Sequence, residues 1–376
     1  MIRVDLNAAY IPADQKTFML HPGKNYHLFG AFLNHGAVSS DLPNLELQNG
    51  RDPLGVANIN TQIIRARALR DWLALSEDGR QQTEVRTQLA DYADESTKRF
   101  HDYYREQLQD ILWNLDKGTV LFVPNRDLGR LGFFCELEAP NMARVKFNGP
   151  GAAQNFLYTG RQVKNIKQVP MRLVPPEILE EKNRTSILTE LDSELSERIF
   201  RLYYGTFAIE NGTCQAEIEV PSENFRPADA TVLSALANVL EDNLQKLERE
   251  ELQPTEFLDS IFLAFDEAEL QLHARLNSEG VVQIAARSVT PLLASVFLSL
   301  VGVASAQQIL DETATRTLTI ENSQCPEDDQ YPRLIEERLF GIVDMLGEDQ
   351  ITLICDRVQE LRERTGASTQ AETIVE

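Results

Sequence analysis

The chain is poor in cysteine, with four in 376 residues, and no two of them are spaced as C-x-x-C. This argues against a zinc ribbon, which needs such pairs. Because disulfides rarely persist in the cytosol, we interpret the four as reduced thiols of a cytoplasmic protein. The N-terminal run MIRVDLNAAYIPAD also lacks a basic segment followed by apolar residues, so we expect no signal peptide.

Recognised catalytic motifs are absent from the sequence as well. It has no Walker lysine loop, no G-x-S-x-G, no H-E-x-x-H and no D-x-D-x-D-G. His21, His27 and His35 lie in one N-terminal segment, but their spacings of six and eight match no standard metal-ligand pattern. We interpret them as turn and surface residues, and we predict no catalytic residue, no metal and no cofactor.

Acidic residues are abundant, but they occur in runs such as LEREEL and EEK, which are typical of solvated helix faces. A metal-dependent nuclease of the restriction type places an acidic residue on one strand and Glu-x-Lys on the next. The EEK run instead follows two prolines in an expected helix, and FDEAELQLHA has no lysine after its acids. A nuclease with an unrecognised active site therefore remains an alternative.

Basic charge is scarce in the second half of the chain. Residues 1–200 contain 24 basic and 26 acidic residues, whereas residues 201–376 contain 12 and 32, within a net charge of −22. Such an acidic half repels nucleic acid, so contact with DNA or RNA must come from the first half. We expect the acidic half to suit a protein partner or a second copy of the chain.

One long stretch, residues 288–310, has no charged residue, and its 23 residues could span a bilayer. Ser, Thr and Gln are frequent in it, and no cluster of Lys or Arg flanks it as one would flank a membrane anchor. We therefore predict a buried central helix. The alternative is a membrane-acting effector in which this segment inserts on activation.

The pattern of apolar residues predicts helices and short strands throughout the chain. Asn211-Gly212 is the type I′ hairpin dipeptide between two alternating strands, and a second hairpin is expected to close at residues 277–280. Further strands are expected in TVLFVP, RLGFFCELE and RQVKNIKQVPMRLV. One predicted helix begins near residue 60. The other main predicted helices cover about 84–115, 227–251, 331–346 and 348–364.

Between Lys117 and Arg172 the strands carry nine basic residues against three acidic ones. Point charges on such a surface suit phosphate contact, and nearby aromatic rings could hold an extruded base. The alternative is that the rings are barrel core and the basic residues a solubilising face. The candidate nucleic-acid contacts are Arg126, Arg130, Arg161, Lys164 and Lys167, and the candidate base pocket is Phe122, Phe134 and Tyr158.

The runs KGTVLFVPNRDLGRLGFFCELEAP and FLYTGRQVKNIKQVPMRLVPPEIL resemble the PUA-like/EVE-like domains of modification-dependent restriction and antiviral defence proteins. Thr119 stands where the family has Asp, and Ile166 or Val169 stands where it often has Trp. The resemblance implies a domain that reads a modified or flipped base in DNA or RNA. The matching segments are Lys117-Gly118, Val120 to Pro124, Gly132 to Glu136 and Arg161 to Pro170.

These observations together predict an α+β protein in two parts. Residues 1–187 form a helical lead-in with a PUA-like small β-barrel at about 115–175. Residues 188–365 form an acidic α+β domain of β-hairpins packed on long helices, and residues 366–376 form a disordered tail. The predicted function is a non-enzymatic nucleic-acid sensor or adaptor of a prokaryotic antiviral defence system, which engages a partner effector.

Overall fold

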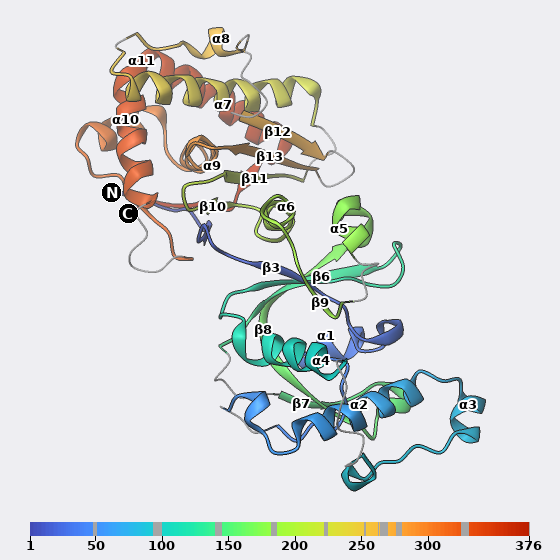
Figure 1. Ribbon diagram of the computed structural model, residues 1–376. Helices are drawn as coiled ribbons and strands as arrows, with labels where there is room; N and C mark the ends of the chain where they lie inside the picture. Colours follow the sequence, from blue (N-terminus) through green and yellow to red (C-terminus); the bar gives the residue numbers. More distant parts are fainter. Residues whose placement is uncertain are drawn as a thin grey trace. The chain divides into compact units, whose positions relative to one another are not determined.

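The computed structural model describes residues 1–47, 51–92, 100–139, 145–181, 186–221, 225–251, 253–261, 263, 270–275, 280–324 and 331–375. The chain is α+β, as predicted, and it divides into two compact units (Figure 1). Unit 1 comprises Met1–Asp14 and Tyr204–Glu376, and unit 2 comprises Gln15–Tyr203. The units differ from the predicted parts at two places. Residues 188–203 belong to unit 2, where residues 188–190 pair with residues 18–20, and the first residues of the chain belong to unit 1, because they pair with strands of the C-terminal part.

The larger sheet of unit 1 contains the two predicted hairpins and one strand from the N-terminus. The first hairpin is confirmed, but its turn is not type I′. Asn211 has φ 54° whereas Gly212 has no positive φ, and the Gly212 N–H donates to the Ile209 carbonyl, which places Glu210 and Asn211 at the centre of the turn. The turn expected at 277–280 lies mostly outside the described residues. The sheet order is β12 (Leu270–Arg275), β13 (Gly280–Ala286), β11 (Cys214–Val220), β10 (Phe207–Ile209) and β2 (Ala9–Ile11), and β15 (Ser368–Thr369) pairs with β11.

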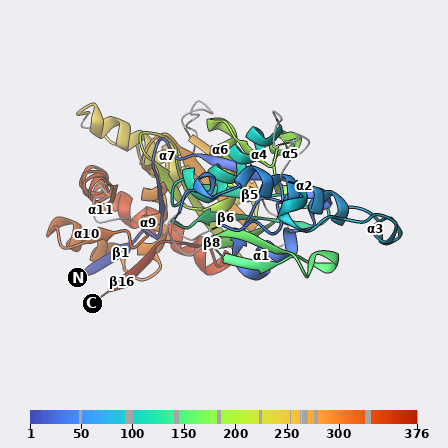
Figure 2. The same ribbon diagram turned by 60° about the horizontal axis from the view of Figure 1, so that its bottom comes forward.

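A second, three-stranded sheet of unit 1 joins the two ends of the chain. β1 (Ile2–Asp5) lies between β14 (Thr319–Glu321), to which it is parallel, and β16 (Glu372–Val375), to which it is antiparallel. The two termini lie side by side in both views (Figure 2). The prediction that residues 366–376 form a disordered tail is therefore wrong over 368–375, because this segment satisfies its backbone groups by pairing.

The helices of unit 1 surround α9 (Thr290–Val301), which packs against the larger sheet on one side and against α7 and α11 on the other. All twelve residues of α9 are buried, as predicted, but the predicted helix over 288–310 ends at Val301, and most of residues 302–310 are at least partly exposed. α11 breaks at Gly347, whose φ is 72°, and this break separates the two predicted closing helices. The other helices are α7 (Pro227–Glu248), α8 (Phe257–Ser260), α10 (Ala306–Ala314) and α11 (Tyr331–Thr365).

Within the described residues, each helix alone is too short or too polar to cross a membrane. α9 and α10 together have the length and composition of a span, but they are bent by 120° relative to each other.

Unit 2 is built on a curled, mixed sheet that forms half of a barrel. Three of its strands lie outside the predicted barrel at 115–175, so the sheet is larger than the sequence predicts. β8 pairs with β6 across a bulge at Phe134 and Glu136. The order is β4 (Ala37–Val38), β8 (Leu157–Pro170), β6 (Leu131–Leu137), β5 (Val120–Val123), β3 (Thr17–Leu20) and β9 (Leu188–Glu190), and β7 (Val145–Asn148) pairs with β8.

Helices cover this sheet, and a hydrophobic core cluster lies between it and three of them. Leu121 and Phe133 of the sheet belong to this cluster together with Phe32, Ile63 and Leu108 of the helices. The predicted helix over 84–115 is wrong at its beginning, because residues 84–88 are not helical. The helices of unit 2 are α1 (Phe29–His35), α2 (Ile59–Leu73), α3 (Glu77–Gln82), α4 (Phe100–Gln109) with η4 (Asp110–Asn114), α5 (Pro176–Glu181) and α6 (Ser193–Tyr203).

Candidate functional site

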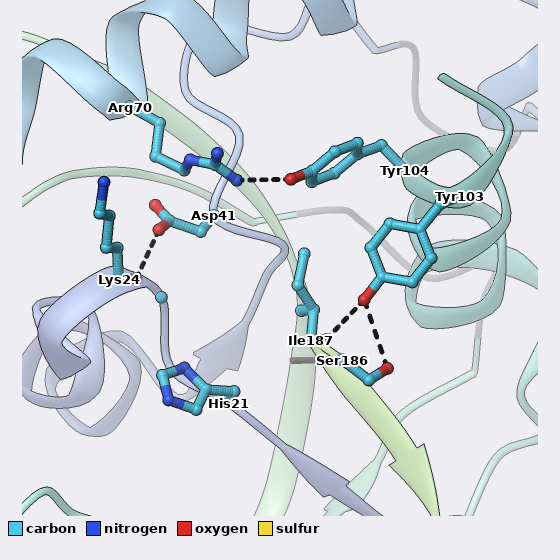
Figure 3. A pocket seen from close by; sticks show the side chains of 9 residues that line it. His21, Lys24, Asp41, Arg70, Tyr103, Tyr104, Ser186 and Ile187 are labelled. Carbon is cyan, nitrogen blue, oxygen red and sulfur yellow. Dashed lines mark hydrogen bonds between the residues drawn. The ribbon is translucent and has the colours of Figure 1, made fainter. Parts of the chain in front are cut away.

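A pocket of about 300 Å³ lies in unit 2 and is the strongest candidate for a functional site (Figure 3). Its walls come from the loop before α1, the loop after β4, the helices α2 and α4, and the segment that leads into β9. We call it the Asp41 pocket. Its lining residues are His21, Gly23, Lys24, Asp41, Arg70, Tyr103, Tyr104, Ser186 and Ile187.

Asp41 is the buried acid of this pocket, with only 3% of its surface exposed. Its Oδ2 accepts a hydrogen bond from the backbone N–H of Lys24 at 2.7 Å, and its Oδ1 lies 3.3 Å from His27 Nε2. Oδ1 is thus shielded from solvent and faces His27. Burial raises the pKa of Asp41, and the nearby His27 and the Lys24 N–H oppose that rise.

Gly23 lets the loop before α1 approach Asp41 closely. Its φ is 77°, a conformation that favours glycine. A Cβ atom at this position would lie 2.8 Å from Asp41 Oδ2 and 2.8 Å from His27 Cε1. Any larger residue at position 23 would therefore push the loop away from the carboxylate.

Tyr104 and Arg70 form the wall that α4 and α2 contribute. The Arg70 guanidinium donates a hydrogen bond to Tyr104 Oη at 3.0 Å, and the Arg67 guanidinium lies 4.7 Å from the centre of the Tyr104 ring. Burial lowers the pKa of Arg70, but hydrogen bonds to Tyr104 and Asp71 outweigh it, and the net shift is upward. Arg70 is therefore a cation fixed in position at the pocket.

Tyr103 forms the opposite wall with the segment that leads into β9. Its hydroxyl donates to Ser186 Oγ at 3.3 Å and accepts from the backbone N–H of Ile187 at 3.0 Å. In Figure 3 the Tyr104 ring projects from α4 toward Arg70, and the Tyr103 ring projects toward Ser186 and Ile187. The pocket thus combines two aromatic rings, a buried carboxylate and two cations.

A smaller pocket of about 180 Å³ adjoins the first and shares Lys24 and Arg70 with it. Five of its nine lining residues have apolar side chains, and the other four are polar or charged. We call it the Pro150 pocket. The residues that line it are Lys24, Asn25, His27, Arg70, Leu73, Ala74, Pro150, Ala152 and Ala153.

Arg126 is the predicted nucleic-acid contact that lies near these pockets. The Tyr26 ring packs at a tilt against His21, with 4.3 Å between the ring centres. Burial raises the pKa of Tyr26, while the positive charge of Arg126 lowers it, so Arg126 lies within electrostatic reach of the same loop. Arg130 follows on the same turn, where it forms an exposed ion pair with Asp127 at 3.2 Å.

The three other predicted contacts make internal interactions. Arg161 is buried, and its guanidinium donates to the carbonyls of Glu138 at 2.7 Å and Leu115 at 2.6 Å. Burial lowers the pKa of Arg161 to about 10. Lys164 pairs with Glu136 at 3.2 Å, and the Lys167 ammonium donates to the Tyr203 carbonyl at 2.9 Å. Arg161 is therefore a buried structural residue and not a surface cation, because its guanidinium donates hydrogen bonds to backbone carbonyls.

The predicted base pocket of Phe122, Phe134 and Tyr158 is closed, since all three side chains are fully buried. The Phe122 and Phe134 rings pack against each other at 5.0 Å. The Tyr158 hydroxyl lies 3.4 Å from His27 Nε2, so Tyr158 supports the side chain that faces Asp41. Tyr158 thus adjoins the Asp41 pocket without lining it.

The sequence analysis missed Asp41, Arg70, Tyr103 and Tyr104 as site residues. One signal was available: Asp41 is an acid in the otherwise uncharged run GAVSSDLPNL, and all of residues 37–43 are buried. Of the three N-terminal histidines, His21 lines the pocket and His27 faces Asp41. Among the described residues, no group of three or more His, Cys, Asp or Glu is placed to hold a metal ion.

The comparisons with known proteins leave this site to be interpreted from its own chemistry. The chain matches no family model, no curated protein and no solved structure.

Proposed function

We propose that the chain is a non-enzymatic nucleic-acid-binding protein that takes a nucleobase into the Asp41 pocket. The observation that carries this proposal is a pocket of about 300 Å³ that brings two tyrosines and two cations beside the buried carboxylate of Asp41. The polar side chains of such a lining can hydrogen-bond to the edge of a base. Aromatic rings stack on any base, which contributes about 1–3 kcal/mol per base.

The distribution of charge between the units supports unit 2 as the binding part. Unit 2 contains 24 basic and 24 acidic residues, whereas unit 1 contains 12 and 34, so unit 1 carries the whole net charge of −22. Phosphates are repelled by such a surface and attracted by local cations. Lys24 and Arg70 lie at the pocket, and Arg126 lies within electrostatic reach of the same loop.

In this proposal unit 1 supplies the protein-binding part of a sensor or adaptor. Its acidic surface would attract and orient a basic partner surface, which speeds association and selects the partner. That the pair acts in a prokaryotic antiviral defence system, and that the base is modified or flipped, rests on the resemblance of residues 117–170 alone.

The first test is binding of the full chain to fluorescent single-stranded DNA and RNA, with unmodified and modified bases, across a salt series. We expect Lys24→Ala combined with Arg126→Ala to weaken binding about tenfold. The salt slope should fall by about 1 for each phosphate that the variant no longer neutralises. The matched control is Lys16→Ala, because Lys16 is an exposed lysine of unit 2 that pairs with Glu190 and lines neither pocket.

Two results would contradict the proposal. One is the absence of binding at low salt for every nucleic acid tested. The other is equal weakening of binding in the Lys24/Arg126 variant and the Lys16 control, which would show that the pocket is not where binding occurs.

A further inference from the structure

The Asp41 pocket and the Pro150 pocket share a wall, and that wall is cationic. Lys24 and Arg70 line both pockets. The Lys24 ammonium lies 3.8 Å from Asp71 Oδ1, and the Arg70 guanidinium donates to the same oxygen at 2.9 Å. Asp41 lines the larger pocket beside them and interacts with Arg70, so the two cations face two carboxylates. A phosphodiester at this wall would take the place of Asp71 as the acceptor for Lys24 and Arg70.

The sizes of the two pockets differ in a way that suggests one divided site. Complete ligand pockets usually measure about 300–1,000 Å³, so the larger pocket, at about 300 Å³, lies at the lower end of that range. The smaller one, at about 180 Å³, lies below it. The Pro150 pocket is thus more readily understood as an extension of the Asp41 pocket than as a separate site.

The two pockets also differ in the types of side chain that line them. The Asp41 pocket is lined by the polar side chains of Asp41, Tyr104 and Ser186, which can recognise the polar edge of a base. The Pro150 pocket offers Leu73, Ala74, Pro150 and Ala153, which can contact the face of a ring without distinguishing its edge. One compartment is therefore suited to selection and the other to less selective packing.

We propose that the two pockets form one binding site for a dinucleotide unit, that is, two nucleosides joined by a phosphodiester. One base lies in the Asp41 pocket, its neighbour packs in the Pro150 pocket, and the phosphate between them contacts Lys24 and Arg70. The inference rests on the proposed function and specifies its ligand. The unit could be two successive nucleotides of a strand or a free dinucleotide, and the chemistry of recognition is the same for both.

The test measures binding of the full chain to a nucleoside 5′-monophosphate and to the dinucleoside monophosphate of the same base. We expect the dinucleoside monophosphate to bind at least tenfold more tightly. Ala152→Trp should bring that ratio close to one, because Ala152 is exposed and its larger replacement would fill the Pro150 pocket. The control is Ala57→Trp, at an exposed alanine of unit 2 that lines neither pocket.

A second measurement needs no variant. A dinucleoside with an uncharged methylphosphonate link should bind at least tenfold more weakly than the phosphodiester, because it cannot pair with Lys24 and Arg70. A single-stranded oligonucleotide that binds more tightly than the dinucleoside monophosphate would identify a strand as the source of the ligand. Equal or weaker binding of the oligonucleotide would identify a free dinucleotide.

The outcomes separate this inference from the proposed function. If both ligands bind equally, both are weakened by Asp41→Asn, and Ala152→Trp has no effect on their ratio, the dinucleotide site is wrong and the base pocket stands. If neither ligand nor the oligonucleotide binds, the inference and the proposed function are both wrong.

Discussion

At the scale of single residues, arginines in one short stretch of sequence have opposite roles. Arg130 is an exposed partner of Asp127, whereas Arg161 is buried beneath the sheet and donates to backbone carbonyls. Nothing in the sequence around Arg161 distinguishes it from a surface cation, because its burial depends on which helix covers that end of β8. Here the covering element is η4, whose following residue Leu115 supplies one of the acceptors.

This difference predicts unequal effects on stability. Arg161→Met would leave the carbonyls of Leu115 and Glu138, and the buried carbonyl of Ile111, without this donor, and we expect it to lower the free energy of unfolding by about 3 kcal/mol. Arg130→Met removes only an exposed ion pair and should change it by less than about 0.5 kcal/mol. Urea unfolding of the two variants provides the measurement. Equal effects would show that Arg161 does not hold the sheet in this way.

Dependence on the folded chain also explains why the sequence analysis did not predict the Asp41 pocket. Lys24, Asp41, Arg70, Tyr104 and Ser186 come from five separate segments, so their proximity exists only in the folded chain. The sequence indicated where basic and aromatic residues gather, and this drew attention to Arg126, which lies within electrostatic reach of the loop before α1. It also led to Phe122 and Phe134, because large aromatic side chains are as common in a core as in a binding site.

At the scale of elements, the sequence predicted features that depend on neighbouring residues, but it did not predict pairings between strands that are distant in the chain. The Asn211-Gly212 hairpin and the break near Gly347 are properties of a few neighbouring residues, and both are confirmed. The pairings of β1 with β14 and β16 join residues more than 300 positions apart. The periodicity of apolar residues carries no information about such pairings, so the last residues of the chain were expected to be disordered.

The pairing of β16 gives a test at this scale. Removing residues 372–376 should lower the free energy of unfolding by about 2–4 kcal/mol, since about four hydrogen bonds at about 1 kcal/mol each hold this strand to β1. Hydrogen exchange should show loss of amide protection in β1. The control replaces the half-exposed Ile374 and Val375 with Thr, which keeps the strand. Unchanged stability after the truncation would mean that β16 is not paired in solution.

At the scale of the whole molecule, unit 2 is an insertion into unit 1. The chain completes β1 and β2, leaves for unit 2 at Asp14, and returns at Tyr204 to form β10 beside β2. The Ala9 N–H donates to the Thr206 carbonyl at 3.1 Å, and β2 and β10 are parallel, so the chain leaves unit 1 beyond one end of this strand pair and returns at the other end. The same division separates charge, since unit 2 is neutral and unit 1 is strongly acidic.

An inserted unit can be excised, and this predicts which fragments fold. Residues 1–14 joined to 204–376 by a Gly/Ser linker of about ten residues should fold cooperatively, because such a linker reaches about 17 Å and β1 and β2 are retained. Residues 15–203 should fold separately, because this unit has its own core. Residues 204–376 alone should not fold, because β14, β16 and β10 lose their partners β1 and β2. Circular dichroism and thermal unfolding of the three fragments distinguish these outcomes, and cooperative unfolding of 204–376 alone would show that the N-terminal strands are dispensable.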